Sequence, residues 1–249
     1  MKILAVEASG PVAGCAVLED GLLIADYNVQ YKKKHAQSLV PMMDEVKRML
    51  ELDLGTVDAV AIAKGPGSFT GLRIGAATVK GAAMAMDVPV IPVPTVDSIA
   101  YNLFGTDSLI CPLMDARRSQ VYTGIYEWRW DFADNKAGAP RFVVLRPQCV
   151  VPIEQIAADL NDRGRSVIFL GDGVPVMREA LSQLMKVPYF FAPAHLARQR
   201  AAAVAALAYS CYQEQGEACM ISADDFRPEY LRLAQAEQEH SEKRNYSLL

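Results

Sequence analysis

The order of the predicted secondary-structure elements constrains the fold more than any other feature of this sequence. Apolar runs and helical periodicity predict β-β-β-α-β-α-β-α in the first half of the chain, and the same order again in the second half. The expected strands are residues 3–6, 13–18, 22–29, 57–63, 90–93, 109–114, 121–126, 141–145, 167–170 and 189–191. The expected helices are residues 35–51, 71–86, 96–103, 153–160, 174–185 and 196–213.

A repeated order of this kind predicts two α/β lobes with mixed central sheets. It is typical of the actin-like ATPase (ASKHA) duplication, which includes sugar kinases, Hsp70 and actin. The boundary is expected near residues 104–107, which gives an N-terminal lobe of residues 1–106 and a C-terminal lobe of residues 107–249. A long hairpin loop is expected at 128–140, and a polar, charged tail at 235–245.

Composition narrows the function classes. The 249 residues are 51% hydrophobic, enough for a large core, and carry a formal net charge of -4. A protein that binds RNA without a partner would normally show a basic surface, so any RNA is expected to be bound mainly by another protein. The five cysteines form no CxxC pair, Glu7 comes too early for a signal peptide, and no apolar run is long enough to span a membrane. We therefore expect a cytoplasmic protein without membrane contact.

Five residues could belong to a cleft between the lobes. In actin-like ATPases, an acid ends the first strand of each half, and the following glycines let backbone N–H groups approach phosphate. The acids are present here, but the hairpin glycines are poorly placed or absent, which predicts a vestigial nucleotide cleft. The expected cleft residues are Glu7, Ser9, Asp115, Gly171 and Gly173. The alternative is that the two acids only cap strand ends or pair with nearby arginines.

Residues 65–75 (GPGSFTGLRIG) are expected to form a loop and the beginning of a helix. Three functional interpretations of this segment can be considered, and the sequence supports none of them. No Lys-Ser/Thr pair follows for a phosphate-binding P-loop, and the third glycine is one place late for a dinucleotide fingerprint. Ser68 has no histidine nearby in sequence for nucleophilic catalysis. The residue is more simply explained as a helix cap, a role that Thr70 could also fill. The chain's three histidines show no metal-ligand spacing, so we expect neither metal ligands nor catalytic residues.

Two helices of the first half are unusually apolar. Between Gly71 and Asp87, the charged residues other than Asp87 itself are Arg73 and Lys80, and the helix before it carries several methionines. Such helices could form half of a bundle that another protein completes. The alternative is that they pack only on each other and on the rest of the chain.

The same loop resembles the signature of the TsaB (YeaZ) family. The resemblance extends along most of the chain: residues 3–9 look like the family's first strand, 35–41 like its first helix entry, 115–117 with 121–122 like its DAR and VY pair, and 228–232 like its PxYLR segment. One departure is Glu7-Ala8-Ser9, where the family usually has Asp-Thr-Ser.

The resemblance implies a non-catalytic subunit that pairs with TsaD, the transferase that adds threonylcarbamoyl to N6 of the adenosine beside the tRNA anticodon. TsaD binds metal through two histidines where Thr95 and Ile99 stand here, so this chain is expected to hold no metal. The ATPase TsaE would join the complex, ATP and metal would be used by the partner subunits, and tRNA would be bound only through the complex. The pairing surface would lie on the two apolar helices, and the same surface would form a homodimer when the chain is alone.

The residues expected at this surface, chosen by helix position, are Leu39, Met42, Met43, Val46, Met49, Leu72, Arg73, Gly75, Ala76, Val79, Lys80 and Ala83. Two other classes stay open. One is a small-molecule kinase that uses Glu7 and Asp115 around magnesium and ATP. The other is a metallopeptidase, which the lack of candidate ligands makes the weaker alternative.

Overall fold

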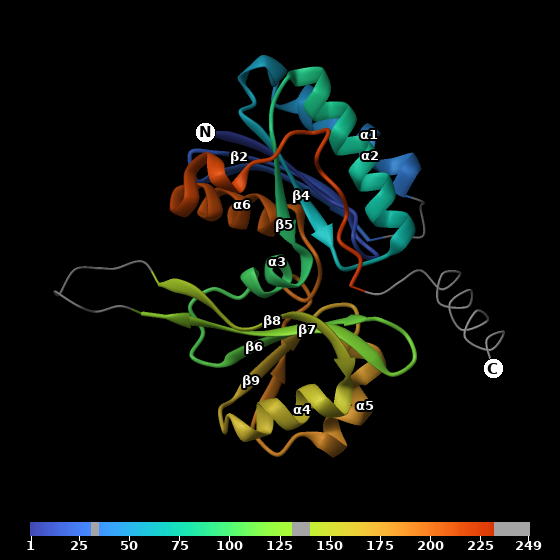
Figure 1. The fold of residues 1–249 in the computed structure, drawn as a ribbon, viewed down its shortest axis with the longest axis vertical. Coiled ribbons are helices and arrows are strands. Elements are labelled where there is room, and N and C mark those ends of the chain that lie inside the picture. Colours follow the sequence, from blue (N-terminus) through green and yellow to red (C-terminus); the bar gives the residue numbers. More distant parts are fainter. Residues whose placement is uncertain (31–34, 131–139, 232–249) are drawn as a thin grey trace, which may run out of the picture.

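The computed structural model describes residues 1–30, 35–130 and 140–231, which form two five-stranded sheets stacked one above the other (Figure 1). The strand orders are β3-β2-β1-β4-β5 and β10-β9-β6-β7-β8, so the two sheets repeat one topology. The actin-like duplication predicted from the element order is therefore the fold. Most of the expected loop at 128–140 and the whole tail at 235–245 lie outside the described residues.

The first sheet combines two hairpins with two parallel crossovers. Its strands are β1 (Lys2–Glu7), β2 (Ala13–Glu19), β3 (Leu22–Val29), β4 (Ala59–Gly65) and β5 (Val90–Pro94). β1 pairs antiparallel with β2 and parallel with β4. The sequence Glu19-Asp20-Gly21 predicts a tight hairpin turn between β2 and β3. The structure confirms this turn, because Asp20 and Gly21 both have positive φ.

The second sheet repeats this plan with β6 (Leu109–Asp115), β7 (Gln120–Arg129), β8 (Arg141–Pro152), β9 (Val167–Leu170) and β10 (Tyr189–Phe191). β6 pairs antiparallel with β7 and parallel with β9, as β1 does with β2 and β4. β8 runs to Pro152, beyond the predicted end at 145, because its register with β7 continues from Arg141 to Pro152 across two irregularities.

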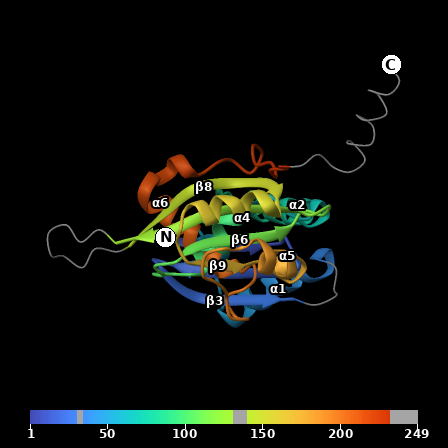
Figure 2. The same cartoon turned by 90° about the horizontal axis from the view of Figure 1, so that it is seen from below.

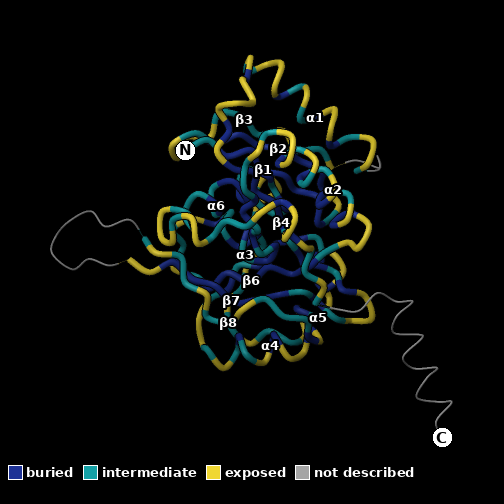
Figure 3. The backbone as a smooth tube through the Cα atoms, turned by 45° about the horizontal axis from the view of Figure 1, so that its top comes forward, coloured by how far each residue is buried: buried dark blue, intermediate teal, exposed yellow. Residues whose placement is uncertain are grey.

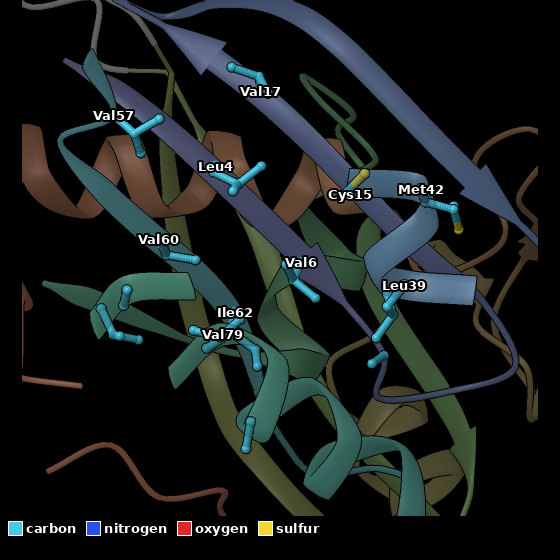
Figure 4. Packing of buried hydrophobic residues seen from close by; sticks show 14 of the residues in the cluster. Leu4, Val6, Cys15, Val17, Leu39, Met42, Val57, Val60, Ile62 and Val79 are labelled. Atoms are coloured by element: carbon cyan, nitrogen blue, oxygen red, sulfur yellow. The ribbon is translucent and has the colours of Figure 1, made fainter. Parts of the chain in front are cut away.

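Helices α1 (His35–Met49) and α2 (Phe69–Met86) cover one face of the first sheet. In Figure 4, Val79 of α2 lies beside Ile62 of β4, and Met42 of α1 lies beside Cys15 of β2. α2 begins two residues before its predicted start, where the Ser68 hydroxyl accepts the Gly71 N–H at 3.3 Å. Ser68 is thus the N-cap that the sequence suggested.

The other face of the first sheet is covered by α6 (Ala201–Gln215), a helix from the second half of the chain. Conversely, α3 (Thr95–Tyr101), from the first half, packs its Val96 and Ile99 on the second sheet. Both helices lie between the sheets (Figure 1). The strands of the first sheet all precede residue 106 and those of the second sheet all follow it, whereas α3 and α6 each pack on the sheet formed by the other half of the chain. α4 (Ile153–Asp162) and α5 (Val174–Leu184) cover the far face of the second sheet (Figure 2).

After α6 and a short 3-10 turn, η3 (Gly216–Cys219), the chain returns to the first sheet. We call residues 220–231 the C-terminal strap. Ile221 forms an antiparallel bridge to Val90 of β5, and Phe226, 1% exposed, packs into the core under α1 and α2. The strap therefore completes the N-terminal lobe, and its end reaches the start of α2.

Candidate functional site

A pocket of about 510 Å³ lies where the two lobes meet. The N-terminal lobe contributes residues 9–11 and 66–69, and the C-terminal lobe contributes residues 114–118, Tyr122 and Asp172. The end of the strap, residues 229–231, forms another part of the wall. Two predicted cleft residues, Ser9 and Asp115, therefore line one pocket.

Glu7, two residues before the pocket-lining Ser9, is fully buried. Its Oε1 accepts the Ser9 N–H at 2.6 Å and also the Ser9 hydroxyl. Burial raises the pKa of Glu7 to about 7, against the lowering effect of the Ser9 hydrogen bonds, and Asp172 raises it further. Glu7 thus holds a turn rather than presenting a free carboxylate to the pocket.

Asp115 repeats this geometry in the second lobe. The Arg117 N–H donates to Asp115 Oδ1 at 2.8 Å, two residues on, as Ser9 does to Glu7. In both hairpins, a backbone N–H that could bind a phosphate oxygen instead donates a hydrogen bond to the chain's own carboxylate. The second turn is also built from Arg117, Arg118 and Ser119 at positive φ instead of glycine. The residues present therefore do not fit a triphosphate cradle.

Gly171 and Gly173 have a structural role against β6. Gly171 has φ +106°, and a Cβ there would overlap the Leu113 carbonyl oxygen; the Gly173 N–H donates to that oxygen at 2.8 Å. Neither glycine lines the pocket. The sequence analysis placed both glycines in a vestigial nucleotide cleft, and in the structure the backbone that they approach closely is that of Leu113.

Asp172 and Gln199 are the residues that the sequence reasoning missed. Gln199 Nε2 donates to Asp172 Oδ1 at 2.8 Å, and the Gln199 side chain fills the space above Gly10. Burial raises the pKa of Asp172. Asp172 stands between the two glycines that were noticed, whereas nothing in the local sequence marks Gln199, because its position depends on the path of the chain between the lobes.

Within the described residues, no three His, Cys, Asp or Glu side chains gather in a way that could hold a metal ion. At the two positions expected to lack ligands, Thr95 Oγ accepts the Gly65 N–H at 3.1 Å, and Ile99 is fully buried. His35 lies against the first hairpin, with Nε2 2.7 Å from the Gly10 carbonyl oxygen. No described helix has the length and apolarity to cross a membrane.

The predicted docking helices have two different faces. Two thirds of the residues proposed for the partner surface are buried in this chain's own core, where they contact the sheet. The buried set is Leu39, Met42, Val46, Leu72, Gly75, Ala76, Val79 and Ala83. Met43 and Lys80 are half-buried, and Met49 and Arg73 are exposed. The structure therefore corrects the choice of interface residues. The apolar residues chosen from the sequence lie mainly on the side of each helix that packs on the sheet.

The outer face of α2 is also apolar, and Val40 is exposed on α1. On α2, Ala77, Gly81 and Ala85 are exposed at spacings of four, and a Cβ added at Gly81 would meet no atom within 4 Å. Met84 beside them is 63% exposed, and Val40 of α1 is 59% exposed. Figure 3 shows the alternation of buried and exposed turns along α1 and α2. We call Val40, Ala77, Gly81, Met84 and Ala85 the outer face.

At the N-terminus of α2, three side chains extend this face toward the pocket. The Arg73 guanidinium lies 3.9 Å from the centre of the Phe69 ring, and the Phe69 and Tyr230 rings are 5.1 Å apart. Tyr230 belongs to the strap, which Lys64 also holds through a 2.8 Å ion pair with Glu229. Helix, strap and pocket are therefore in direct contact.

Comparison with known proteins gives the class and then the family. The sequence model of the family "TsaD: tRNA N6-adenosine threonylcarbamoyltransferase" matches residues 29–240. The crystal structure of an uncharacterized Pseudomonas aeruginosa protein with similarity to peptidase YEAZ covers 93% of this chain and 99% of its own, with a TM-score of 0.74 and 25% identity. Fold and site thus define a two-lobed actin-like protein of the TsaD-related class.

A particular branch of this class matches along nearly the whole sequence. The tRNA threonylcarbamoyladenosine biosynthesis protein TsaB of Bacillus subtilis (strain 168) is 31% identical over 237 residues, which are 95% of this chain and 96% of that protein. The Haemophilus influenzae protein of the same name is 34% identical over 125 residues, 49% of this chain and 52% of its own length. The chain belongs to the TsaB family, as the loop at 65–75 and the other motifs predicted.

Proposed function

We propose that this protein is the non-catalytic partner of a TsaD-type subunit in the complex that adds threonylcarbamoyl to N6 of the adenosine beside the tRNA anticodon. Family membership supports the pathway, since the relatives are named for threonylcarbamoyladenosine biosynthesis. The observation that carries the partner role is the outer face, an apolar surface formed mainly by α2, whose opposite side already covers the sheet. Small residues at Ala77, Gly81 and Ala85 allow a partner helix to approach closely.

The remaining chemistry is assigned to the partners. The TsaD-type subunit holds the metal, a TsaE-type ATPase uses ATP, and tRNA is bound through the assembled complex in the cytoplasm. The net charge of -4 agrees with weak RNA binding by this chain alone. Without its partner, the chain forms a homodimer through the same outer face.

The kinase alternative has less support. Kinases of this fold need free backbone amides at both hairpins, and here the Ser9 and Arg117 N–H groups donate to Glu7 and Asp115. We therefore expect the purified chain, given threonylcarbamoyl-adenylate and tRNA, to form no modified nucleoside. Product formed by this chain alone would overturn the non-catalytic role.

Co-purification with the TsaD-type protein of the same cell tests the partner role. Ala77→Arg places a long charged side chain on the outer face, so we expect the complex to be lost while the fold is kept. Ala158→Arg is the matched control, because Ala158 is an exposed alanine on α4 of the other lobe. Ala76 is unsuitable for this test, since it is 7% exposed and packs in the core. An intact complex with Ala77→Arg would move the interface elsewhere.

A further inference from the structure

The junction between the lobes holds buried polar side chains whose hydrogen bonds are only partly satisfied within the described residues. We call Glu7, Ser9, Asp172 and Gln199 the junction cluster; Glu7 comes from β1, Asp172 from the second lobe, and Gln199 from the segment that leads to α6. Within the described part of the chain, Glu7 Oε2 and Gln199 Oε1 have no hydrogen-bond partner. Both side chains are at most 1% exposed. A buried acceptor without a donor is unfavourable, so the cluster favours a proton on Glu7.

The charged groups around the cluster also favour the neutral form of Glu7. Asp172, across the lobe junction, disfavours a negative charge on Glu7, and Asp115 in turn disfavours one on Asp172. Arg198 favours the charge on Asp172, and His35 faces the Gly10 carbonyl from α1. Among the described groups that shift the pKa of Glu7 most, none is a cation. Ionised Glu7 would therefore face a carboxylate across the lobe junction with one oxygen unpartnered.

The cluster is connected to the beginnings of both outer-face helices. The Ser68 N–H donates to the Ser9 carbonyl oxygen at 2.7 Å, and Ser68 is the N-cap of α2. A Cβ at Gly67 would overlap the same Ser9 oxygen, so this contact leaves no free space. His35, the first residue of α1, bonds the next carbonyl, that of Gly10, at 2.7 Å. Any movement of Ser9 and Gly10 reaches both helices.

We propose that protonation of Glu7 regulates the docking of the partner protein, by holding Ser9 and Gly10 where they position the N-termini of α1 and α2. The proposal rests on the proposed function, since it names the regulation of that docking surface. Loss of the proton places a charge against Asp172 and draws water or new donors into the junction. Ser9 and Gly10 then move, and the outer face is no longer presented in its docking geometry. Glu7 acts as a positioning residue and does not touch the partner.

The relevant pH range is close to neutral, because burial raises the pKa of Glu7 to about 7. If only the neutral form docks, the apparent dissociation constant rises as the neutral fraction falls, by up to roughly thirtyfold between pH 6.0 and pH 8.5. Docking is strongest below the folded pKa and weakens as pH rises through it.

The first test measures the affinity of the full chain for the TsaD-type protein at pH 6.0, 7.0 and 8.5 by calorimetry. Glu7→Gln keeps the neutral shape, so we expect tight, pH-independent binding. Asp172→Asn removes the facing charge, which should shift the loss of affinity to lower pH. Glu154→Gln, an exposed acid on α4, is the control and should follow the wild type. Equal pH profiles for the wild type and Glu7→Gln would overturn the proposal.

A second measurement separates this proposal from the proposed function. In the isolated chain, amide hydrogen exchange of residues 69–72, corrected for intrinsic pH dependence, should accelerate severalfold from pH 6.0 to pH 8.5 in the wild type and stay constant in Glu7→Gln. A partner that fails to bind at every pH would refute the proposed function, and this exchange result would still decide the proton coupling. Exchange that is the same in both proteins at both pH values would refute the coupling itself.

Discussion

At the residue scale, Glu7 and Asp115 show how one local device serves both halves of a duplicated chain. Each carboxylate belongs to the last residue of its strand and accepts the N–H two residues later, which closes the turn into the next strand. Their surroundings differ, since Glu7 is fully buried and the Asp115 side chain is 21% exposed. The same hydrogen bond is therefore buried in the first lobe and partly open to solvent in the second.

The raised pKa of Glu7 predicts a stability that depends on pH. The neutral side chain is favoured in the folded state, where the pKa of Glu7 is about 7 against 4.5 for an unburied glutamate. Its stabilising contribution is therefore fully present below pH 4.5 and is lost as pH rises through 7. Glu7→Gln removes this dependence. Urea unfolding at pH 5.0 and 8.5 should show the variant gaining roughly 2–3 kcal/mol relative to the wild type as pH rises. A constant difference would contradict the assignment.

Gly171 and Gly164 allow the free-energy cost of replacing glycine by alanine to be compared at two positions. Both have positive φ, but a Cβ at Gly171 would overlap the Leu113 carbonyl, whereas nothing lies within 4 Å of one at Gly164. Gly164→Ala should cost about 1 kcal/mol in the free energy of unfolding, from backbone strain alone. Gly171→Ala adds the overlap and should cost at least about 2 kcal/mol more by chemical denaturation. Equal costs would show that β6 moves away freely.

At the element scale, α2 separates two roles on its two faces. Val79, fully buried, packs on the first sheet, and Met84 extends from the outer face. Val79→Ala leaves a cavity and should lower the free energy of unfolding by about 2 kcal/mol, with little effect on partner affinity. Met84→Ala should change stability by less than about 0.5 kcal/mol but weaken partner binding about fivefold. Calorimetry and urea unfolding of both variants check this, and a Met84→Ala protein with wild-type affinity would contradict the docking surface.

The element order and the turn chemistry could be predicted from the sequence because they depend on local pattern. The hairpin at Asp20-Gly21, the cap at Ser68 and the duplicated topology are all of this kind. Which face of α2 meets the sheet could not be decided, since alanine and glycine occupy both faces and carry little apolar contrast. The spacing of Ala77, Gly81 and Ala85 was present in the sequence, but only burial shows that it faces outward.

At the scale of the whole molecule, each half of the chain contributes a helix that packs on the sheet of the other half. α3 packs on the second sheet, and α6 and the strap pack on the first. The sequence pattern predicts these helices but not the sheet on which each one packs. That choice depends on the path of the chain between the lobes and on contacts far apart in sequence, such as the 2.9 Å hydrogen bond from the Ala201 N–H to Asn28 Oδ1. The lobes are therefore structural units without being independent segments of the chain.

This exchange predicts that residues 1–106 do not fold alone. Without α6, the buried Ile3, Ala5 and Ala61 on one face of the first sheet would lie open to water, and without Phe226 the other face would lose part of its core. Fragment 1–106 should show no cooperative urea transition and should bind a hydrophobic dye. Addition of fragment 107–249, which supplies α6 and the strap, should restore a cooperative transition. A cooperative transition in fragment 1–106 alone, at the midpoint of the full chain, would show that the sheet needs neither.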